Sequence, residues 1–400
     1  MDAASPWLPF WPHPGAHYVQ RIHLLSLAAH AVVALGLSAV LSWKSALAGT
    51  TAIWLVLALR LRLLVEERPR SRVAVKLVDE PLFWHWGNCV LGLLVLPLTV
   101  ALLHFSGWSP LEMLGLHASQ GDRSVAEAAL VAYVAAAPVS AWGIWGIRRR
   151  LRVRRVEVVV PGLPAAFDGY RVVHLSDLHI GGFDPRARGF RWAERANACR
   201  PDLCVVTGDF VTSGSGFYGD AAEVVGRLRA PDGVFACMGN HDQTDNDSLT
   251  GLLEASGVRV LRNQWESVRR GAAELVVAGL DDRYTGKADL DRTLSGRPSH
   301  APTILLAHDP YIGDAAAERG VQLILSGHTH GGQVGIPWIA DFVNLTMLMR
   351  QPRSGLHEIG PTQHYISAGL GTTGPPLRLG VTPEIGLLVL RSRPGNMATP

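Results

Sequence analysis

Apolar residues are concentrated in the first 150 positions of this 400-residue chain, and that concentration most constrains what the chain can fold into. Four apolar stretches approach the length of about 20 residues that a membrane-spanning helix needs. A backbone in lipid has to satisfy its hydrogen bonds within the segment, so we expect four transmembrane helices. The predicted spans are residues 24–43, 46–65, 82–105 and 125–147.

Ionisable residues inside these spans are few. Arg60 and Arg62 lie in the second span, and their charged ends would have to reach the membrane interface. His30 lies well inside the first span, and we interpret this single His as packed or hydrogen-bonded and not as part of a proton relay. The membrane region therefore lacks the paired charges that are typical of a transport path.

Lys and Arg collect on one side of the predicted membrane region. The segment between the second and third spans carries Arg68, Arg70, Arg72 and Lys76, and the fourth span ends in the basic run 148–155. The positive-inside rule then places both termini and the C-terminal half on the cytoplasmic side of an inner or cell membrane. We interpret the basic run as a flank that stops transfer, with a lipid-headgroup site as the alternative. No removable signal is expected.

Charge and cysteine content exclude two other classes of protein. The net charge of +3 is too small to indicate a nucleic-acid partner. The four Cys, at positions 89, 199, 204 and 237, form no pair of CxxC units and no disulfide framework. Cys204 and Cys237 lie in apolar runs that resemble buried strands, which predicts a role in core packing.

Short β-branched runs alternate with helical stretches from about residue 156 onward, as in α/β proteins. The expected strands are residues 170–175, 203–207, 234–238, 275–280, 303–307 and 322–325. Polar residues follow several of these runs within a few positions. Because ligands of open α/β folds bind at the carboxyl ends of strands, we expect these polar residues to converge.

Five short motifs supply carboxylate, imidazole and carboxamide groups in this half of the chain. They are Asp177-Leu178-His179, Gly208-Asp209, Gly239-Asn240-His241-Asp242, His308, and Gly327-His328-Thr329-His330. Oxygen and nitrogen ligands of this kind suit divalent Mn, Fe or Zn, and no Cys lies among them. Two such ions about 3.5–4 Å apart can bind the attacking and leaving oxygens of a displacement at phosphorus.

In this order the motifs resemble the calcineurin-like metallophosphoesterase superfamily over nearly all of residues 165–392. The segments 326–333 and 369–374 resemble its bacterial YkuE/YaeI-type branch. The resemblance implies an α/β fold, a four-layer αββα sandwich over residues 151–400, preceded by the all-α transmembrane region of residues 1–150. It also implies a dinuclear site between the loops.

The resemblance also implies a role for each motif residue. Seven residues match the family's ligand positions: Asp177, His179 and His330 for the first metal, Asn240, His308 and His328 for the second, and Asp209 as a bridge between both. His241 matches a non-ligand His that stabilises or protonates the leaving oxygen. Asp242 would orient the imidazole of His241.

Some of these residues also have simpler interpretations. Taken singly, Asp177 and Asp209 could be helix N-caps and Asn240 a turn residue. The glycines at 327, 331, 332 and 335 would permit close approach of a phosphate or only tight turns. Arg378 is interpreted as structural, with a substrate phosphate as the alternative partner. The pair 281–282, two Asp, is a weaker candidate still.

The sequence thus predicts a membrane-anchored, dinuclear metal-dependent phosphoesterase. Anchoring suits a substrate that is itself in the membrane, because it raises the concentration of the active site near lipid. We therefore expect hydrolysis of a phosphodiester or pyrophosphate bond in a lipid-linked substrate such as UDP-2,3-diacylglucosamine. The alternatives are another phospholipid or a soluble nucleotide as substrate, or an inactive membrane sensor or transporter. The sequence predicts no oligomeric state.

Overall fold

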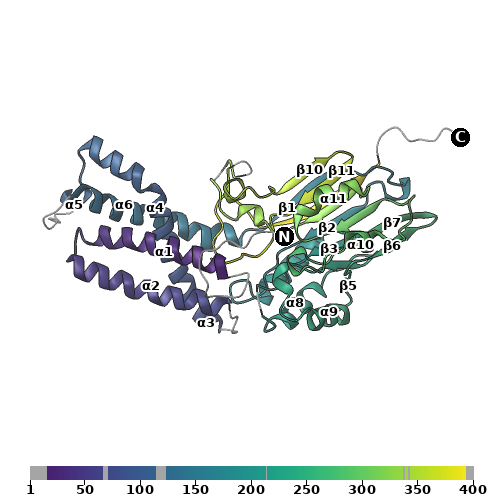
Figure 1. Cartoon of the computed structure of the whole chain (residues 1–400), viewed down its shortest axis with the longest axis horizontal. Helices are drawn as coiled ribbons and strands as arrows, with labels where there is room; N and C mark the ends of the chain where they lie inside the picture. Colours follow the sequence, from purple (N-terminus) through teal and green to yellow (C-terminus); the bar gives the residue numbers. More distant parts are fainter. Residues whose placement is uncertain are drawn as a thin grey trace. The chain divides into compact units, whose positions relative to one another are not determined.

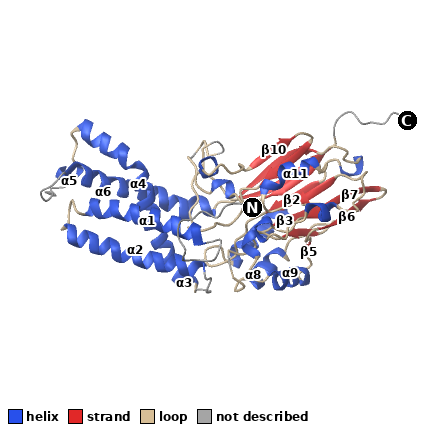
Figure 2. Ribbon diagram, in the orientation of Figure 1, coloured by secondary structure: helices blue, strands red, loops and turns tan. Residues whose placement is uncertain are grey.

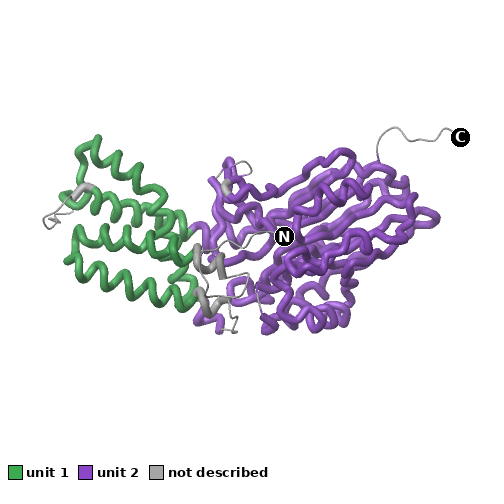
Figure 3. Tube along the Cα trace, viewed as in Figure 1, with its two compact units in different colours: residues 1–66, 76–141 green, residues 67–75, 142–400 purple. Residues whose placement is uncertain are grey.

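The computed structural model describes residues 16–65, 71–113, 123–212, 214–336, 338–340 and 343–392. It divides the chain into two compact units, which are described here one at a time (Figure 3). The helical unit comprises residues 1–66 and 76–141, and the sandwich unit comprises residues 67–75 and 142–400. The sequence places this boundary after residue 150, whereas the division in the structure falls after residue 141.

The described part of the helical unit consists of helices and their connections (Figure 1). The helices are α1 Ala16–Leu37, α2 Trp43–Val65, α4 Glu80–Ser106, α5 Pro110–Met113 and α6 Arg123–Ala141. Helices α1, α4 and α6 pack against one another, and α2 packs on α1. Small residues allow this close packing, since a Cβ on Gly36 would lie 2.7 Å from the backbone nitrogen of Leu130.

Two helices in the described residues are long and apolar enough to cross a membrane. They run from Arg72 to Ser106 and from Val125 to Arg149, with mean hydropathies of 2.2 and 1.6, and they contain the third and fourth predicted spans. The first predicted span is shortened, because α1 ends at Leu37 and the chain turns before Trp43. That residues 24–43 and 46–65 also span stays a prediction.

The charge of Arg60 in the second predicted span is paired within the unit. Arg60 Nε lies 2.8 Å from Asp79 Oδ1, and both residues are buried. Asp79 ends the π-helical turn Val75–Asp79 that precedes α4. Arg60 thus has an acidic partner within the unit, and its reach to the membrane interface stays a prediction. Two basic residues used for the orientation, Arg68 and Arg70, lie outside the described residues.

The sandwich unit is built on two mixed six-stranded sheets, with orders β1-β12-β2-β3-β4-β5 and β10-β11-β9-β8-β7-β6 (Figure 2). Strands β2 to β5 run parallel, as do β7, β8, β9 and β11. The strands are β1 Arg152–Val159, β2 Arg171–Leu175, β3 Leu203–Thr207, β4 Val234–Cys237, β5 Arg259–Val260, β6 Gln264–Arg270, β7 Ala273–Gly279, β8 Thr303–Leu306, β9 Leu323–Ser326, β10 Gly355–Ile359, β11 Thr362–Ile366 and β12 Glu384–Arg391.

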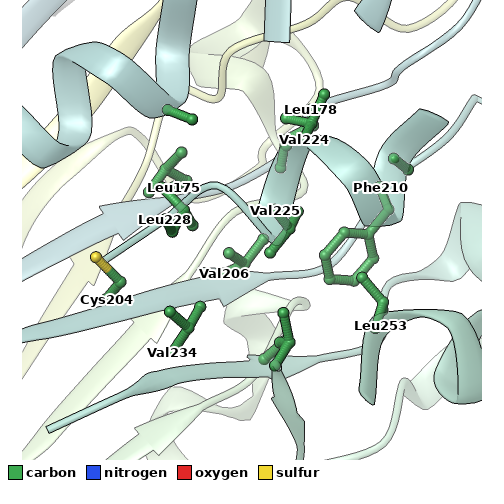
Figure 4. Close-up of a cluster of buried hydrophobic side chains, with 14 of the residues drawn as sticks. Leu175, Leu178, Cys204, Val206, Phe210, Val224, Val225, Leu228, Val234 and Leu253 are labelled. Carbon is green, nitrogen blue, oxygen red and sulfur yellow. The ribbon is translucent and has the colours of Figure 1, made fainter. Parts of the chain in front are cut away.

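Helices cover the outer faces of both sheets. They are α7 Arg186–Ala198, α8 Tyr218–Val225 and α9 Asn246–Ala255 on the first sheet, and α10 Leu290–Leu294 and α11 Gly313–Glu318 on the second. One core lies between the sheets and joins residues such as Val205 and Leu306. Another, drawn in Figure 4, includes Val206 and Cys204 of β3 together with Val225 of α8 and Leu253 of α9. The unit is thus layered as helices, sheet, sheet and helices.

All six expected strands are present, with ends that differ by no more than two residues. Cys204 and Cys237 are fully buried in β3 and β4, which confirms their predicted packing role. Six strands were not expected: β1, β5, β6, β10, β11 and β12. Strand β1 was obscured by its charges, since its residues alternate exposed and half-buried at a sheet edge and include Arg152, Arg154 and Arg155.

The basic run 148–155 is also part of the fold, and its role as a flank that stops transfer stays a prediction. The residues from 152 belong to β1, and Arg148 is 1% exposed. Arg148 Nη1 lies 3.2 Å from Asp184 Oδ1, and Arg188 donates a hydrogen bond to the backbone carbonyl of Arg148. A buried arginine in such a network is held by the fold of the sandwich unit itself and not by lipid headgroups.

Candidate metal centre

The polar residues of the five motifs follow strands of both sheets. Asp177 follows β2, Asp209 follows β3 and Asn240 follows β4. In the second sheet, His308 follows β8 and His328 follows β9. All five strands lie inside their sheets, and β2, β3 and β4 are parallel to one another, as are β8 and β9, so their carboxyl ends present these residues at one edge of the sandwich.

Asp209 lies at the centre of the cluster. Its Oδ2 atom is 3.2 Å from His308 Nε2 and 3.6 Å from His179 Nε2. Its Oδ1 atom accepts a hydrogen bond of 2.9 Å from the backbone N–H of His241. One carboxylate therefore faces two histidines from different sheets.

The remaining motif residues fall on either side of Asp209. On one side, His330 Nε2 lies 3.3 Å from Asp177 Oδ1 and 3.1 Å from His179 Nε2. On the other side, Asn240 Oδ1 lies 3.1 Å from His308 Nε2 and 2.8 Å from the Nδ1 atom of His328. The structure thus brings together Asp177, His179, Asp209, Asn240, His308, His328 and His330.

The orientation of His308 shows that the cluster attracts a cation. His308 Nδ1 is 2.7 Å from the carbonyl oxygen of Thr207, so Nδ1 carries a proton and donates it. Nε2 faces two oxygens, Asp209 Oδ2 and Asn240 Oδ1, so in the absence of metal a proton on Nε2 satisfies them. The same position suits a metal ion that displaces this proton. Burial lowers the pKa of His308, but the carboxylates of Asp209 and Asp177 raise it well above its usual value.

The donor set fits divalent metal ions. Two groups of ligand atoms lie within 4.8 Å of one another, namely Asp177, His179 and His330, and Asp177, Asp209 and His308. All five residues are at most 2% exposed. Buried carboxylates and imidazoles without thiolates are the ligands of Mn, Fe or Zn.

The backbone of the cluster is strained, and the residue types in the sequence did not predict this strain. Five of the motif residues have positive φ angles: Asp177 (52°), His179 (45°), Asp209 (54°), His328 (70°) and His330 (50°). Non-glycine residues rarely adopt this region, and such strain gathers at functional sites. The surrounding fold therefore holds these side chains in place against a local cost in energy.

Two glycines leave room for this arrangement. A Cβ on Gly327 would lie 1.9 Å from Ser176 Oγ, and one on Gly239 would lie 2.2 Å from Asp209 Oδ1. Gly327 thus serves close packing of the loop against Ser176 and Asp177, which favours the structural interpretation of this glycine.

Asp242 does not contact the imidazole of His241 in the way that we expected. The Nδ1 atom of His241 instead donates to the carbonyl oxygen of Thr212. The Asp242 carboxylate accepts backbone N–H bonds from Asp209 (2.9 Å), Phe210 (2.9 Å) and Gly239 (2.8 Å). These three donors follow the ends of β3 and β4, so Asp242 fixes the loop that carries Asp209.

Arg378 is fully buried, so its structural interpretation is favoured over contact with a substrate phosphate. It donates to the carbonyl oxygens of Gly371 and Ala368, and its Nη2 lies 3.2 Å from His330 Nδ1. Burial lowers the pKa of Arg378 to about 10. Asp281 pairs with Arg262 at 3.0 Å.

The sequence interpretation did not identify Tyr284. The hydroxyl of Tyr284 lies 3.4 Å from His328 Nε2, and the residue is 64% exposed. The backbone N–H of Tyr284 donates a hydrogen bond of 2.8 Å to Asp282 Oδ1, in the loop after β7. The signal that could have identified it is the pair Asp281-Asp282 after a predicted strand, which marks one more strand end at the same edge.

A four-layer α/β sandwich with a buried cluster of His, Asp and Asn at its strand ends defines the class of metal-dependent phosphoesterases. Residues 170–332 match the family described as calcineurin-like phosphoesterase. The chain is 30% identical over 269 residues to the uncharacterized metallophosphoesterase YkuE of Bacillus subtilis, covering 65% of this chain and 94% of that protein. The chain belongs to the calcineurin-like metallophosphoesterase family, whose members are hydrolases.

Two longer relatives have names that describe them as transmembrane proteins. A "transmembrane protein with metallophosphoesterase domain" from Danio rerio is 31% identical over 66% of this chain, and one from Bos taurus is 34% identical over 60%. The chain spans 62% and 57% of the lengths of these two relatives. Together with the two apolar helices, these names suggest membrane anchoring.

Proposed function

We propose that this protein is a membrane-anchored phosphoesterase that uses two metal ions to hydrolyse a phosphodiester or pyrophosphate bond in a lipid-linked substrate. The observation that carries the proposal is the convergence of seven potential ligands, with Asp209 at their centre. UDP-2,3-diacylglucosamine is the first substrate to test, since its pyrophosphate bond lies between a soluble nucleotide and two acyl chains.

The contacts support a division of the ligands between two ions. Asp177, His179 and His330 would hold the first, while Asn240, His308 and His328 would hold the second. Asp209 would bridge them, because one carboxylate offers two oxygens and lies between both groups of side chains. Mn, Fe and Zn all suit this set of ligands.

When bound, such a pair of ions lowers the pKa of a bound water and neutralises charge on phosphoryl oxygens. The chain's own residues hold the geometry. His308 is fixed by its bond to the Thr207 carbonyl, and Asp242 fixes the loop of Asp209. Buried, preset ligands of this kind need little rearrangement as charge develops on the substrate.

His241 is suited to assist the leaving group. Its Nδ1 donates to the Thr212 carbonyl, which leaves Nε2 as the ring nitrogen available to a substrate. The His241 ring lies edge-on to the His179 ring, with centroids 5.0 Å apart, next to the proposed first metal. A protonated Nε2 would donate to the oxygen that departs from phosphorus.

An exposed apolar loop close in sequence to His330 supports a substrate with acyl chains. In the described part of the loop, Ile336 is 53% exposed, Trp338 99% and Ile339 46%. Met347 and Met349 are more than half exposed where the loop returns. Exposed apolar groups gathered in one segment are typical of a surface that meets lipid or another apolar partner.

Turnover by the full-length protein in detergent tests the proposal. The panel comprises UDP-2,3-diacylglucosamine, its deacylated form, a phospholipid and a soluble nucleotide diester, each with Mn and with or without a chelator. We expect chelator-sensitive turnover and the highest kcat/KM for the acylated nucleotide. Preference for the soluble nucleotide would contradict the lipid-linked substrate, and turnover that survives chelation would contradict the metal dependence.

A matched pair of variants tests the apolar loop. Trp338→Ser should raise KM for acylated substrates and leave the soluble diester unchanged. Val159→Ser is the control, because Val159 is 41% exposed at the end of β1, which runs antiparallel to the strands that carry the site. Equal effects of both substitutions would remove the argument from the loop.

Orientation is tested by fusing reporters to the chain. The basic segments predict that a reporter after Pro400 and one after Asp122 lie on opposite sides, with Pro400 in the cytoplasm. A reporter that places Pro400 outside the cytoplasm would overturn the proposed location of the catalytic unit.

A further inference from the structure

A second group of potential metal ligands lies in the helical unit. It consists of His30 on α1, and His85 and Cys89 on α4. His85 and Cys89 are four residues apart and share one face of α4, which places both beside α1. The sequence indicated His30 as a lone histidine, and helix packing gives it two partners.

Two distances suit ligands around one tetrahedral ion, but Cys89 Sγ also lies 3.9 Å from His85 Nδ1 and so faces the ring plane, which means that the His85 ring would turn when an ion binds. His30 Nε2 and His85 Nε2 are 3.3 Å apart, and Cys89 Sγ is 3.5 Å from His85 Nε2. Metal bonds of about 2.05 Å to nitrogen and about 2.3 Å to sulfur at tetrahedral angles put two nitrogens about 3.4 Å apart and nitrogen and sulfur about 3.6 Å apart. All three ligand atoms lie within 4.8 Å of one another.

The outer ring nitrogens are held as in metal sites. His30 Nδ1 lies 2.7 Å from the carbonyl oxygen of Ser26, to which it donates. His85 Nδ1 lies 2.8 Å from the hydroxyl of Tyr133 on α6. Histidine ligands usually bond through the second nitrogen to a carbonyl or another polar group, which fixes the ring and leaves Nε2 free for the ion.

His30 and Cys89 are 3% and 1% exposed, so the inward atoms have little access to water. No acidic side chain belongs to the group, and its charge would come from the sulfur. An ion would displace the thiol proton of Cys89, which leaves a thiolate with two neutral imidazoles.

We propose that the helical unit binds one zinc-type transition-metal ion through His30 Nε2, His85 Nε2 and the Cys89 thiolate, with a fourth position open. The ion joins α1 to α4, and Tyr133 is a positioning residue that orients His85 from α6. The proposal is independent of the substrate and of the cluster around Asp209.

A chain of hydrogen bonds without an ion is the competing arrangement. Tyr133 would donate to His85 Nδ1, His85 Nε2 would donate to His30 Nε2, and His30 would donate to Ser26. This arrangement satisfies both imidazoles, and it leaves the thiol of Cys89 protonated. The state of Cys89 therefore separates the two arrangements.

Co²⁺ is a suitable probe, because a bond between thiolate and Co²⁺ gives a charge-transfer band in the near ultraviolet. The cluster around Asp209 has no Cys, so its ions cannot contribute to that band. We expect the band in full-length protein in detergent and in Asp209→Asn, and its loss in Cys89→Ala. The control Cys199→Ala, at a half-buried thiol of the sandwich unit, should retain it. Absence of the band, or its persistence in Cys89→Ala, overturns the proposal.

Alkylation of Cys89 in the Asp209→Asn protein tests the same point without altering the site. Zn²⁺ should slow the reaction by tenfold or more, and a chelator should restore it, as followed by mass spectrometry of the peptide that contains Cys89. An equal rate with and without Zn²⁺ overturns the proposal even where Cys89→Ala fails to fold.

Discussion

Buried polar side chains are held in different ways in the two units. In the sandwich unit they follow strand ends on strained backbone, with glycines packed behind them, as at Gly327 and Asp177. In the helical unit they project from regular helices, as do His85 and Cys89 on α4. Strand ends bring groups from five segments to one point, whereas a helix face brings together only the residues of the helices that pack against it.

The difference predicts how each unit responds to substitution. A polar change at the strand ends removes a ligand or its support, so chemistry should be lost while the layers still fold. A polar change between the helices should alter packing or ion content in that unit and leave turnover in place. The predictions below test this contrast.

The largest expected effect is that of Asp209→Asn. Because Asp209 faces both groups of ligands, its loss should lower kcat/KM by far more than the roughly 10–100-fold of a residue that only supports a ligand. Metal content per chain should fall in parallel, as measured by elemental analysis. Near-normal turnover with full metal content would refute the bridging role.

Asp79→Asn is the matched control in the helical unit. Asp79 is as buried as Asp209, at 1% exposure, and pairs with Arg60. Its neutralisation should lower thermal stability, because it leaves a buried guanidinium with less compensation. Turnover per folded molecule should stay close to that of the parent. Loss of turnover on the scale of Asp209→Asn would break the contrast between the units.

His241→Ala should lower kcat by about 10²–10⁴-fold, as expected for removal of an acid that aids the leaving group. The metals and substrate binding should remain, since His241 is not among the proposed ligands. The loss should shrink for a nitrophenyl ester, whose leaving group needs little protonation. Equal losses on good and poor leaving groups, or a missing metal, would contradict this role. His300→Ala, at an exposed histidine, serves as the control.

Asp242→Asn should have a smaller effect, about 10–100-fold in kcat/KM. An amide offers one acceptor oxygen to the three backbone N–H groups that the carboxylate now holds, so the loop of Asp209 should loosen. Metal affinity should fall together with turnover. Asp245→Asn is the control, because Asp245 caps α9 through Ser248 and Asn caps equally well. Indistinguishable behaviour of the two variants would remove the supporting role of Asp242.

The sequence predicted which residues follow the strand ends, but it did not predict the contacts that hold these residues in place. Apolar runs ending in Asp177, Asp209 and His308 could be read directly, since parallel strands collect their carboxyl ends. The contact of Asp242 with backbone N–H groups could not, because it depends on loop conformation after β3 and β4. The sequence indicated His30 but not its partners His85 and Cys89. In apolar helices the sequence does not determine which face of α1 packs against α4.

The smallest expected effect concerns acid stability of the sandwich unit. His174 in β2 and His364 in β11 are buried and bond to Thr207 and Ser326. Burial lowers the pKa of each to about 3 from the usual 6.5. Below pH 6.5 the unfolded chain therefore binds protons that the folded state excludes, so stability falls as the pH drops from 6.5 toward 3. At pH 5.5 each histidine should lower the free energy of unfolding by about 1.4 kcal/mol relative to neutral pH.

Urea unfolding at pH 7.5 and 5.5 measures this difference. In His364→Gln, the decrease in the free energy of unfolding between the two pH values should be smaller by about that amount. An unchanged pH dependence in His364→Gln would show that His364 is protonated in the folded unit.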